Sequence, residues 1–400
     1  MKLTSTAITL LLSAGIATQA NADTSTRLSE VEQELKEIKS QLTKNGRTQA
    51  SPIKIGGAVR FGYGVKDYDS DDKNRGGDID FDVFRLDVNG TVGDITLSAQ
   101  YRWYQYMNVV HHADLAYQFN DNWQGKIGIT QVPFGNLTYN SNSFFFSTNF
   151  YVGLEDDYDS GVVFTGDYGQ HDIRIGYFKN DEMGDIDGYV EDKTARYSYD
   201  IVGTRDLDNE GIYDAPGQAL ADDSMLTLRY SYHFANAEVG ASILTGGIEG
   251  ESGDAGYHNA YAFHVKSKID NIGIIFQYTD YEYDLDDGSE FVTVGAYAFH
   301  DTIPASAEIY NLNLSYDMKV NIGPVTNLTF YNDYNVMTNK SGGLSEDTVM
   351  NVTGVLATAG SLYTYIDFAS GKNQPFINGS LAGDSTETNS RLNINFGFYF

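Results

Sequence analysis

The stretch Leu392-Asn393-Ile394-Asn395-Phe396-Gly397-Phe398-Tyr399-Phe400 alternates between apolar and polar, small or amphipathic side chains. Period-two alternation predicts a β-strand with one apolar face. Because the pattern continues to the last residue, we expect this face to meet lipid rather than a protein core. Five residues form the face: Leu392, Ile394, Phe396, Phe398 and Phe400.

The first 22 residues have the pattern of an export signal. Lys2 supplies a positive start, an apolar run covers residues 7–17, and Ala20-Asn21-Ala22 is a small-x-small cleavage site. The run is too short to cross a bilayer as a helix. We therefore predict a signal peptide over residues 1–22, with a membrane-anchored N-terminus as the alternative.

A short helix is expected next, within residues 23–52. Apolar residues recur there at alternating steps of three and four, which is the a/d pattern of a coiled coil. Leucine at a with isoleucine at d favours three or four helices over two. We predict a periplasmic coiled-coil segment; an amphipathic helix on a surface is the alternative. The repeat consists of Leu28, Val31, Leu35, Ile38 and Leu42.

The composition limits how the rest of the chain could cross a membrane. No later stretch is apolar for long enough to form a membrane helix, so a spanning chain would have to be a closed β-barrel. The 30 Tyr, 22 Phe and 41 Gly suit a barrel, and the absence of cysteine excludes disulfides and thiolate chemistry. A secreted β-sandwich or lectin is the alternative, and the number of strands distinguishes the two.

Residues 53–400 alternate between strands, tight turns and long polar loops. An even number of strands with short turns on one rim and long loops on the other is typical of a transmembrane barrel. None of the six prolines lies inside a predicted strand, as a closed ladder requires. We predict an all-β, 16-stranded antiparallel barrel with strands at 53–65, 79–91, 94–106, 109–119, 122–132, 159–168, 170–179, 224–234, 236–246, 257–269, 271–283, 306–319, 324–337, 348–358, 360–369 and 390–400.

The same alternation assigns basic side chains to the inside of the barrel. In the third strand, Tyr101 and Trp103 fall on the lipid face, which turns Arg102 inward. A charge on the lipid face costs about 2–4 kcal/mol at the membrane midplane. Sixteen strands leave an aqueous channel. The predicted pore-lining bases are Arg60, Arg85, Arg102, Lys126, Arg174 and Arg229, with Lys54, His233, Lys266, Lys268, Lys319 and Arg391 also inward.

Acidic residues dominate the loops of a chain with a formal charge of −29, above all between residues 180 and 223. Acidic loops at a channel mouth would concentrate cations and repel anions. The alternative is that they only solvate the outer surface and bind divalent ions that bridge lipopolysaccharide.

The loop at residues 133–158 differs because it is rich in aromatic residues. We expect it to bury its rings against the inner barrel wall and to bring Glu155, Asp156 and Asp157 toward Arg60, Arg85 and Arg102. Carboxylates opposite guanidinium groups would narrow the channel and set a field across it. Packing of the rings at a subunit interface is the alternative.

At this point the chain resembles the porin O/P group of Gram-negative outer-membrane porins. The signal, the coiled coil, the strand count, Val132-Pro133-Phe134-Gly135 and Asp159-Ser160-Gly161-Val162 carry the resemblance. It implies a homotrimeric, water-filled channel in the outer membrane, in contact with lipid and lipopolysaccharide, with its third long loop folded inside. We predict passive diffusion of small hydrophilic solutes and ions, and no nucleic-acid partner. A phosphate-selective or other substrate-specific porin is the alternative, although Glu155-Asp156-Asp157 stand where phosphate-selective members tend to be basic.

Motifs for other chemistry are weak. The sequence has no Gly-x-Ser-x-Gly or His-Glu-x-x-His motif, and alternation would point His111 and His112 to opposite faces. We therefore expect no enzymatic activity. Two incomplete calcium-loop patterns, at 67–78 and 206–217, allow at most weakly bound Ca²⁺ at acidic loops, and we expect no other cofactor. An adhesin-type barrel with a closed lumen is a further alternative.

Overall fold

The computed structural model describes residues 53–400. The predicted signal peptide over 1–22 and the coiled-coil segment over 23–52 lie outside the described residues. Within the described part of the chain, no helix is long and apolar enough for a membrane span.

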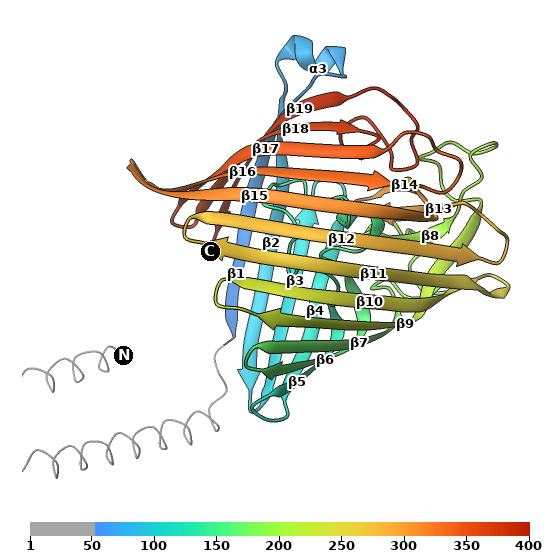
Figure 1. Cartoon of the computed structure of the whole chain (residues 1–400), viewed down its shortest axis with the longest axis horizontal. Coiled ribbons are helices and arrows are strands. Elements are labelled where there is room, and N and C mark those ends of the chain that lie inside the picture. Colours follow the sequence, from blue (N-terminus) through green and yellow to red (C-terminus); the bar gives the residue numbers. More distant parts are fainter. Residues whose placement is uncertain (1–52) are drawn as a thin grey trace, which may run out of the picture. The chain divides into compact units, whose positions relative to one another are not determined.

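Sixteen antiparallel strands form a closed barrel, which confirms the predicted fold (Figure 1). Each strand of this barrel wall pairs with the next along the chain, and the last pairs back with the first. The predicted ranges differ most at β9, which begins at Gln218 rather than at residue 224. The wall consists of β1 (Lys54–Lys66), β2 (Asp78–Val92), β3 (Ile95–Tyr104), β4 (Asn108–Gln118), β5 (Trp123–Gln131), β6 (Tyr158–Tyr168), β7 (His171–Asn180), β9 (Gln218–His233), β10 (Ala237–Gly250), β11 (Gly253–Ile269), β12 (Ile272–Leu285), β15 (Ser306–Ile322), β16 (Val325–Thr338), β17 (Thr348–Ala359), β18 (Leu362–Lys372) and β19 (Asn389–Tyr399).

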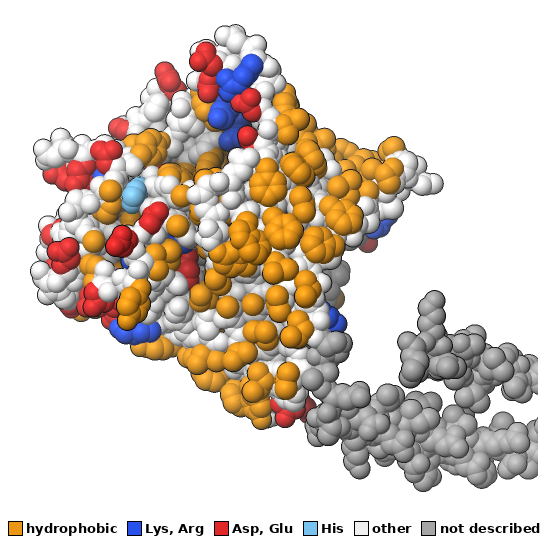
Figure 2. Space-filling model, turned by 180° about the vertical axis from the view of Figure 1, so that it is seen from behind, with side chains coloured by type: hydrophobic (Ala, Val, Ile, Leu, Met, Phe, Trp, Pro, Cys, Tyr) orange, Lys and Arg blue, Asp and Glu red, His pale blue; other side chains and the backbone are white. Residues whose placement is uncertain are grey.

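Each strand of the wall separates an apolar outside from a polar inside. In β9, Leu226 and Leu228 are about half exposed on the outer surface, whereas Thr227 and Arg229 between them are buried within the barrel. Figure 2 shows the result on one face of the barrel: apolar side chains spread over the wall, and most acidic and basic groups lie beyond it, at the left and the top of the view. This arrangement is what a strand between lipid and water requires.

Three further strands were not predicted. β8 (Asp200–Thr204), β13 (Phe291–Ala296) and β14 (Phe299–Pro304) come from the long loops and pair into a small antiparallel sheet, here called the inner sheet. It lies at the end of the barrel that carries the long loops (Figure 1). Every residue of β8 is buried, so the segment shows no alternation from which a strand could be recognised.

A short helix, α3 (Ser70–Arg75), was also missed. It begins after Asp69, whose side chain accepts hydrogen bonds from the backbone N–H groups of Asp71 and Asp72, and it ends at Gly76 in the left-handed conformation. These are the usual start and stop of a helix. At six residues, the helix is too short for its periodicity to be recognised.

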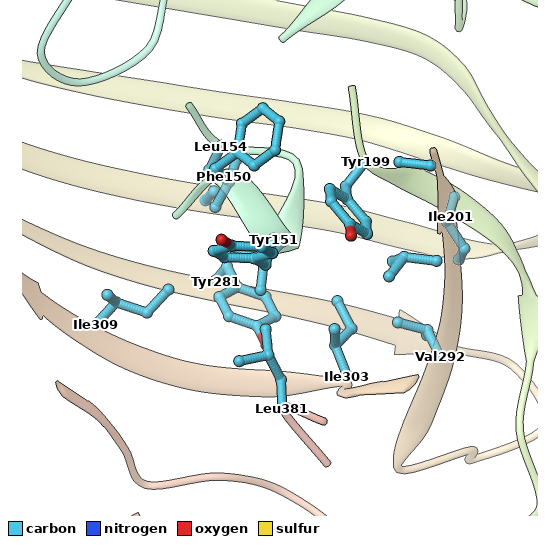
Figure 3. Packing of buried hydrophobic residues seen from close by; sticks show 14 of the residues in the cluster. Phe150, Tyr151, Leu154, Tyr199, Ile201, Tyr281, Val292, Ile303, Ile309 and Leu381 are labelled. Atoms are coloured by element: carbon cyan, nitrogen blue, oxygen red, sulfur yellow. The ribbon is translucent and has the colours of Figure 1, made fainter. Parts of the chain in front are cut away.

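An apolar cluster joins the inner sheet to the aromatic loop that precedes β6. Figure 3 shows Phe150, Tyr151 and Leu154 from this loop beside Tyr199, which directly precedes β8, and Ile303 of β14. The first two residues belong to a 3-10 helical turn, η1 (Phe150–Val152). All five side chains are at least 98% buried. The same cluster includes Tyr281 of β12 and Ile309 of β15, so the long loops pack against the inner face of the barrel wall.

Candidate pore constriction

Loop 3, residues 132–157 between β5 and β6, crosses the interior of the barrel. Its backbone donates hydrogen bonds to inward-facing side chains of the opposite wall: Asn136 to Gln277 Oε1 at 2.8 Å, and Ser143 to Asp333 Oδ2 at 2.7 Å. Gln277 and Asp333 belong to β12 and β16 and are fully buried. Side-chain amides and carboxylates of the inner wall thus accept hydrogen bonds from backbone N–H groups of a loop that has no neighbouring strand to pair with.

Two of the bases that were assigned to the lumen hold the beginning of this loop. Arg229 Nε donates to the Gly135 carbonyl oxygen at 2.7 Å, and Lys266 Nζ donates to the Leu137 carbonyl oxygen at 3.0 Å. Arg229 also forms ion pairs with Asp172 and Glu238. Its charge is therefore neutralised beneath the loop.

A cavity of about 590 Å³ remains between loop 3 and the wall formed by β1, β2, β3 and β19. Four arginines from these strands line one side, and aromatic rings of loop 3 line the other. Of the predicted pore-lining bases, Arg60, Arg85 and Arg102 meet in this cavity. The fourth arginine is Arg391.

The four arginines differ in how their charge is balanced. Arg60 Nε lies 2.8 Å from Asp82 Oδ2, and Arg85 Nη2 lies 2.6 Å from Asp87 Oδ2. Arg102 instead donates to Gln100 Oε1 at 2.6 Å.

Arg391 donates to the carbonyl oxygen of Phe376 at 3.0 Å and to Asn393 Oδ1 at 3.2 Å. Among residues 53–400, neither Arg102 nor Arg391 has a carboxylate oxygen within 4.0 Å. Two positive charges of the cavity therefore lack an acidic partner in the described part of the chain.

Aromatic rings pack against the guanidinium groups of the cavity. Arg102 lies over the ring of Tyr197 at 4.4 Å, and Arg60 lies over the ring of Phe144 at 5.2 Å. Cation–π contact of this kind holds the side chain in place without neutralising it. The cavity therefore presents fixed positive groups set among aromatic rings.

The other predicted pore-lining bases lie outside this cavity. Lys126 and Arg174 belong to β5 and β7, and Arg174 pairs with Asp172 at 3.0 Å on its own strand. Arg229 lies beneath loop 3. The structure thus brings three of the six predicted bases together.

The three carboxylates of loop 3 have separate surroundings. Glu155 accepts hydrogen bonds from the backbone N–H groups of Asn140 and Ser147, so it faces its own loop. Asp156 accepts from the Tyr197 hydroxyl at 2.7 Å and so approaches Arg102 through the ring of that tyrosine. Burial raises the pKa of both carboxyls to about 7.

Asp157 turns away from the arginines toward other acids, Asp159 and Asp200. The structure therefore does not place Glu155, Asp156 and Asp157 as one row opposite the guanidinium groups. Sequence spacing alone could not show this, because the loop has no periodicity.

The two adjacent histidines of β4 form a pair, so the prediction of opposite faces was wrong. His111 Nδ1 and His112 Nδ1 are 3.0 Å apart. The β3–β4 register shifts between Gln100 and Tyr101, which leaves His111 as an extra residue on β4. A β-bulge interrupts alternation and directs neighbouring side chains to one side.

The predicted calcium loops use their acids for local structure. Asp69 caps α3, and Asp206 accepts from the backbone N–H of Asp208 at 3.1 Å. Within residues 53–400, three acidic ligand atoms come within 4.8 Å of one another at two other places. Weak Ca²⁺ binding at residues 67–78 and 206–217 stays a prediction.

Several cavity residues were missed because they come from loops. Tyr297 lies in the two-residue turn between β13 and β14, and Phe376 lies in the long loop after β18. By contrast, Tyr365 and Tyr399 lie on β18 and β19, next to outward-facing residues. Alternation was a sufficient signal for these two tyrosines.

No protein-family model and no curated protein sequence matches the chain. Several solved structures, in contrast, match the chain by their fold. The outer membrane channel DcaP of Acinetobacter baumannii superposes with a TM-score of 0.57 at 14% identity, covering 88% of this chain and 97% of that one. OmpT of Vibrio cholerae gives 0.55 at 14%, covering 88% and 98%. The anion-selective porin from Comamonas acidovorans gives 0.55 at 10%, covering 88% and 100%.

These likenesses concern the fold. The chain has the closed 16-stranded barrel of Gram-negative outer-membrane porins, over nearly the full length of the solved neighbours. The narrower likeness to the porin O/P group has no matching family model.

Proposed function

We propose that this protein is an outer-membrane porin: a water-filled channel of a Gram-negative bacterium through which small hydrophilic solutes and ions diffuse passively. The observation that carries the proposal is the closed barrel with loop 3 hydrogen-bonded across its interior, beside a cavity lined by four arginines. The apolar outer surface fits lipid, and the polar inner surface fits water.

In this proposal loop 3 forms the constriction. Its backbone is held by buried groups of the opposite wall, so the loop keeps a fixed position in the lumen. Solutes pass between its aromatic rings and the arginines of β1, β2, β3 and β19. The position of the loop then sets the size limit, while the arginines set the electrostatic preference.

Planar-bilayer recordings test the constriction. A variant that lacks residues 139–146 should show a larger single-channel conductance and a changed reversal potential in a salt gradient. A matched control removes an exposed segment, residues 189–191, and should conduct as the unmodified protein does. Unchanged conductance and selectivity in the first variant would refute the constriction. If the unmodified protein carries no current, the closed, adhesin-type barrel is correct instead.

Anion preference is the second candidate, and a specific observation favours it: Arg102 and Arg391 have no carboxylate oxygen within 4.0 Å among the described residues. Unpaired guanidinium groups attract anions and can bind phosphate bidentately. Reversal potentials in chloride and then in phosphate separate the cases. A weakly selective current supports general diffusion, and a small saturable phosphate current supports the phosphate-selective alternative implied by the porin O/P resemblance.

We also propose that the channel is a homotrimer, surrounded by lipid and lipopolysaccharide. Among the solved neighbours is OmpT of Vibrio cholerae in a trimer form, at 16% identity and a TM-score of 0.54. Native mass spectrometry of the protein in detergent tests the assembly. A monomer as the main species would refute the trimer while leaving the channel proposal open to the recordings above.

A further inference from the structure

A second group of acids lies away from the arginine cavity, where loop 3 ends. Asp157 of loop 3, Asp159 of β6 and Asp200 of β8 each contribute one carboxylate oxygen to a group in which all three atoms lie within 4.8 Å of one another. We call these three residues the buried triad. Their side chains are at least 95% buried, so water does not screen them from each other.

More acids than bases surround this triad. Asp181, Glu182 and Asp222 are also buried nearby, and each adds to the electrostatic repulsion within the group. The basic group packed among them is Arg196, which lies 2.7 Å from both Asp181 and Asp200.

A histidine stands at the edge of the acid group. His258 Nδ1 lies 3.7 Å from Asp222 Oδ1. Lys193 also interacts electrostatically with Asp181 and Glu182. Within residues 53–400, one arginine, one lysine and one histidine therefore face six carboxyl groups.

Such a concentration of buried carboxylates is unfavourable without a further positive charge. Arg196 already pairs with both Asp181 and Asp200, so it does not neutralise the triad by itself. A bound cation would relieve this repulsion and keep the acids ionised.

Unpaired oxygen atoms indicate where such a cation belongs. Asp159 is 99% buried, yet its Oδ1 atom has no hydrogen-bond partner among the described residues. Asp222 Oδ1 and both carboxylate oxygens of Glu182 likewise have no hydrogen-bond partner among the described residues. Buried carboxylate oxygens almost always have a partner, so a vacant one at the centre of an acid group points to a ligand.

We propose that the buried triad binds one divalent cation, and that the ion is Ca²⁺. Oxygen-only ligands suit hard cations rather than zinc or copper. Ca²⁺ binds oxygen at about 2.3–2.6 Å, so ligands on opposite sides of it stand roughly 5 Å apart, whereas Mg²⁺ requires a smaller octahedron. The three oxygens of the triad lie within 4.8 Å of one another, close enough to bind one ion. A buried site made of protein ligands suits Ca²⁺, because Mg²⁺ usually keeps several of its waters.

The ion would connect three parts of the molecule. Asp157 ends loop 3, Asp159 begins a wall strand, and Asp200 begins the inner sheet. One cation at this point ties the constricting loop and the inner sheet to the barrel wall. The site is separate from the arginine cavity, and the inference does not depend on the channel proposal.

Calcium stoichiometry and affinity test the site directly. The purified full chain, stripped with EDTA and dialysed against radioactive Ca²⁺, should retain one Ca²⁺ ion for each triad, that is, one per chain. Asp159→Asn together with Asp200→Asn should weaken that binding at least tenfold.

The matched control is Glu249→Gln, in the half-exposed group formed by Asp185, Asp223 and Glu249. This variant should leave Ca²⁺ binding at the triad unchanged. Because it is purified in the same way as the double variant, Ca²⁺ bound by residual lipopolysaccharide is the same in both samples. Loss of binding in the control but not in the double variant would assign the ion to the other group and overturn the proposal.

Thermal unfolding gives a second readout that also works on the unmodified protein. Ca²⁺ should raise its Tm relative to EDTA, even if the double variant fails to fold. In EDTA, Asp159→Asn should be more stable than the unmodified protein, because one repelling charge is gone, and Ca²⁺ should no longer shift its Tm. No Ca²⁺-dependent shift in the unmodified protein, from micromolar to millimolar Ca²⁺, would refute the site.

Discussion

The barrel wall and the inner sheet are both antiparallel, yet their residues face different surroundings. In β9 of the wall, Leu228 is exposed toward the lipid side, while the neighbouring Arg229 is buried inside. In β8 of the inner sheet, every residue is buried. Alternation therefore marks a strand that separates lipid from water, and it disappears where both faces of a strand are covered by protein.

The largest effect is expected in the inner sheet. Ile303→Ala removes a fully buried side chain from the apolar cluster and should destabilise the inner sheet and loop 3 by about 2–5 kcal/mol. Hydrogen exchange in denaturant would measure the loss through the amides of residues 132–157. The control, Ile243→Ala, alters a half-exposed residue on the outer face of β10 and should cost less than about 1 kcal/mol. Equal costs would contradict the difference between the two regions.

The wall itself is tested by neighbouring residues of β5. Ile127→Lys places a charge on the lipid side at the middle of the strand and should destabilise the barrel by about 2–4 kcal/mol. Lys126→Gln, one position away and turned inward, should change stability by less than roughly 0.5 kcal/mol. Urea unfolding in lipid vesicles would measure both. A larger cost for the inward substitution would reverse the assigned faces.

A smaller effect is expected on ion selectivity. Arg102→Gln removes a guanidinium group that has no carboxylate within 4.0 Å. The reversal potential in a salt gradient should therefore change in the direction of greater cation permeability. A unit charge at about 4 Å in water is worth about 1 kcal/mol, or roughly a five-fold change in the permeability ratio. Arg174→Gln, whose charge pairs with Asp172 outside the cavity, should change the ratio less. The opposite ranking would place the selective groups elsewhere.

The smallest effect concerns pH. Burial raises the pKa of Asp156 in the folded protein to about 7, above its usual value of 3.8. The folded state therefore holds this proton more tightly than the unfolded state. The stability that Asp156 contributes is complete below about pH 4 and is lost as the pH rises through 7. Loop 3 should thus show less hydrogen-exchange protection at pH 8 than at pH 5, after correction for intrinsic rates.

Asp156→Asn should reduce this pH dependence, because an amide does not titrate, while Glu155 still contributes. Asp208→Asn in an exposed loop should leave the dependence as it is. An identical dependence in the Asp156 variant and the unmodified protein would show that other groups are responsible.

The sequence predicted the wall and the arginines on it for one physical reason. Arg60, Arg85 and Arg102 alternate with lipid-facing residues, so their direction follows from strand parity. Parity carries no information about Tyr297, in the turn between β13 and β14, or about Phe376, in the long loop after β18.

The failures have equally specific causes. A single extra residue in β4 put His111 beside His112 and broke the parity rule. The buried triad joins residues from loop 3, β6 and β8, and β8 has no pattern that would reveal it as a strand. Contacts made through tertiary packing were therefore beyond the reach of periodicity.

The seam between β1 and β19 has a consequence for how the protein is made. Ala58 pairs with Tyr399, and the backbone N–H of Phe400 donates to the Gly57 carbonyl oxygen at 3.0 Å. Until β19 has been synthesised, both edges of the growing sheet carry unpaired donors and acceptors that invite aggregation. The barrel can therefore close only when this last strand pairs with β1, and a chain truncated before residue 389 would leave two sheet edges open.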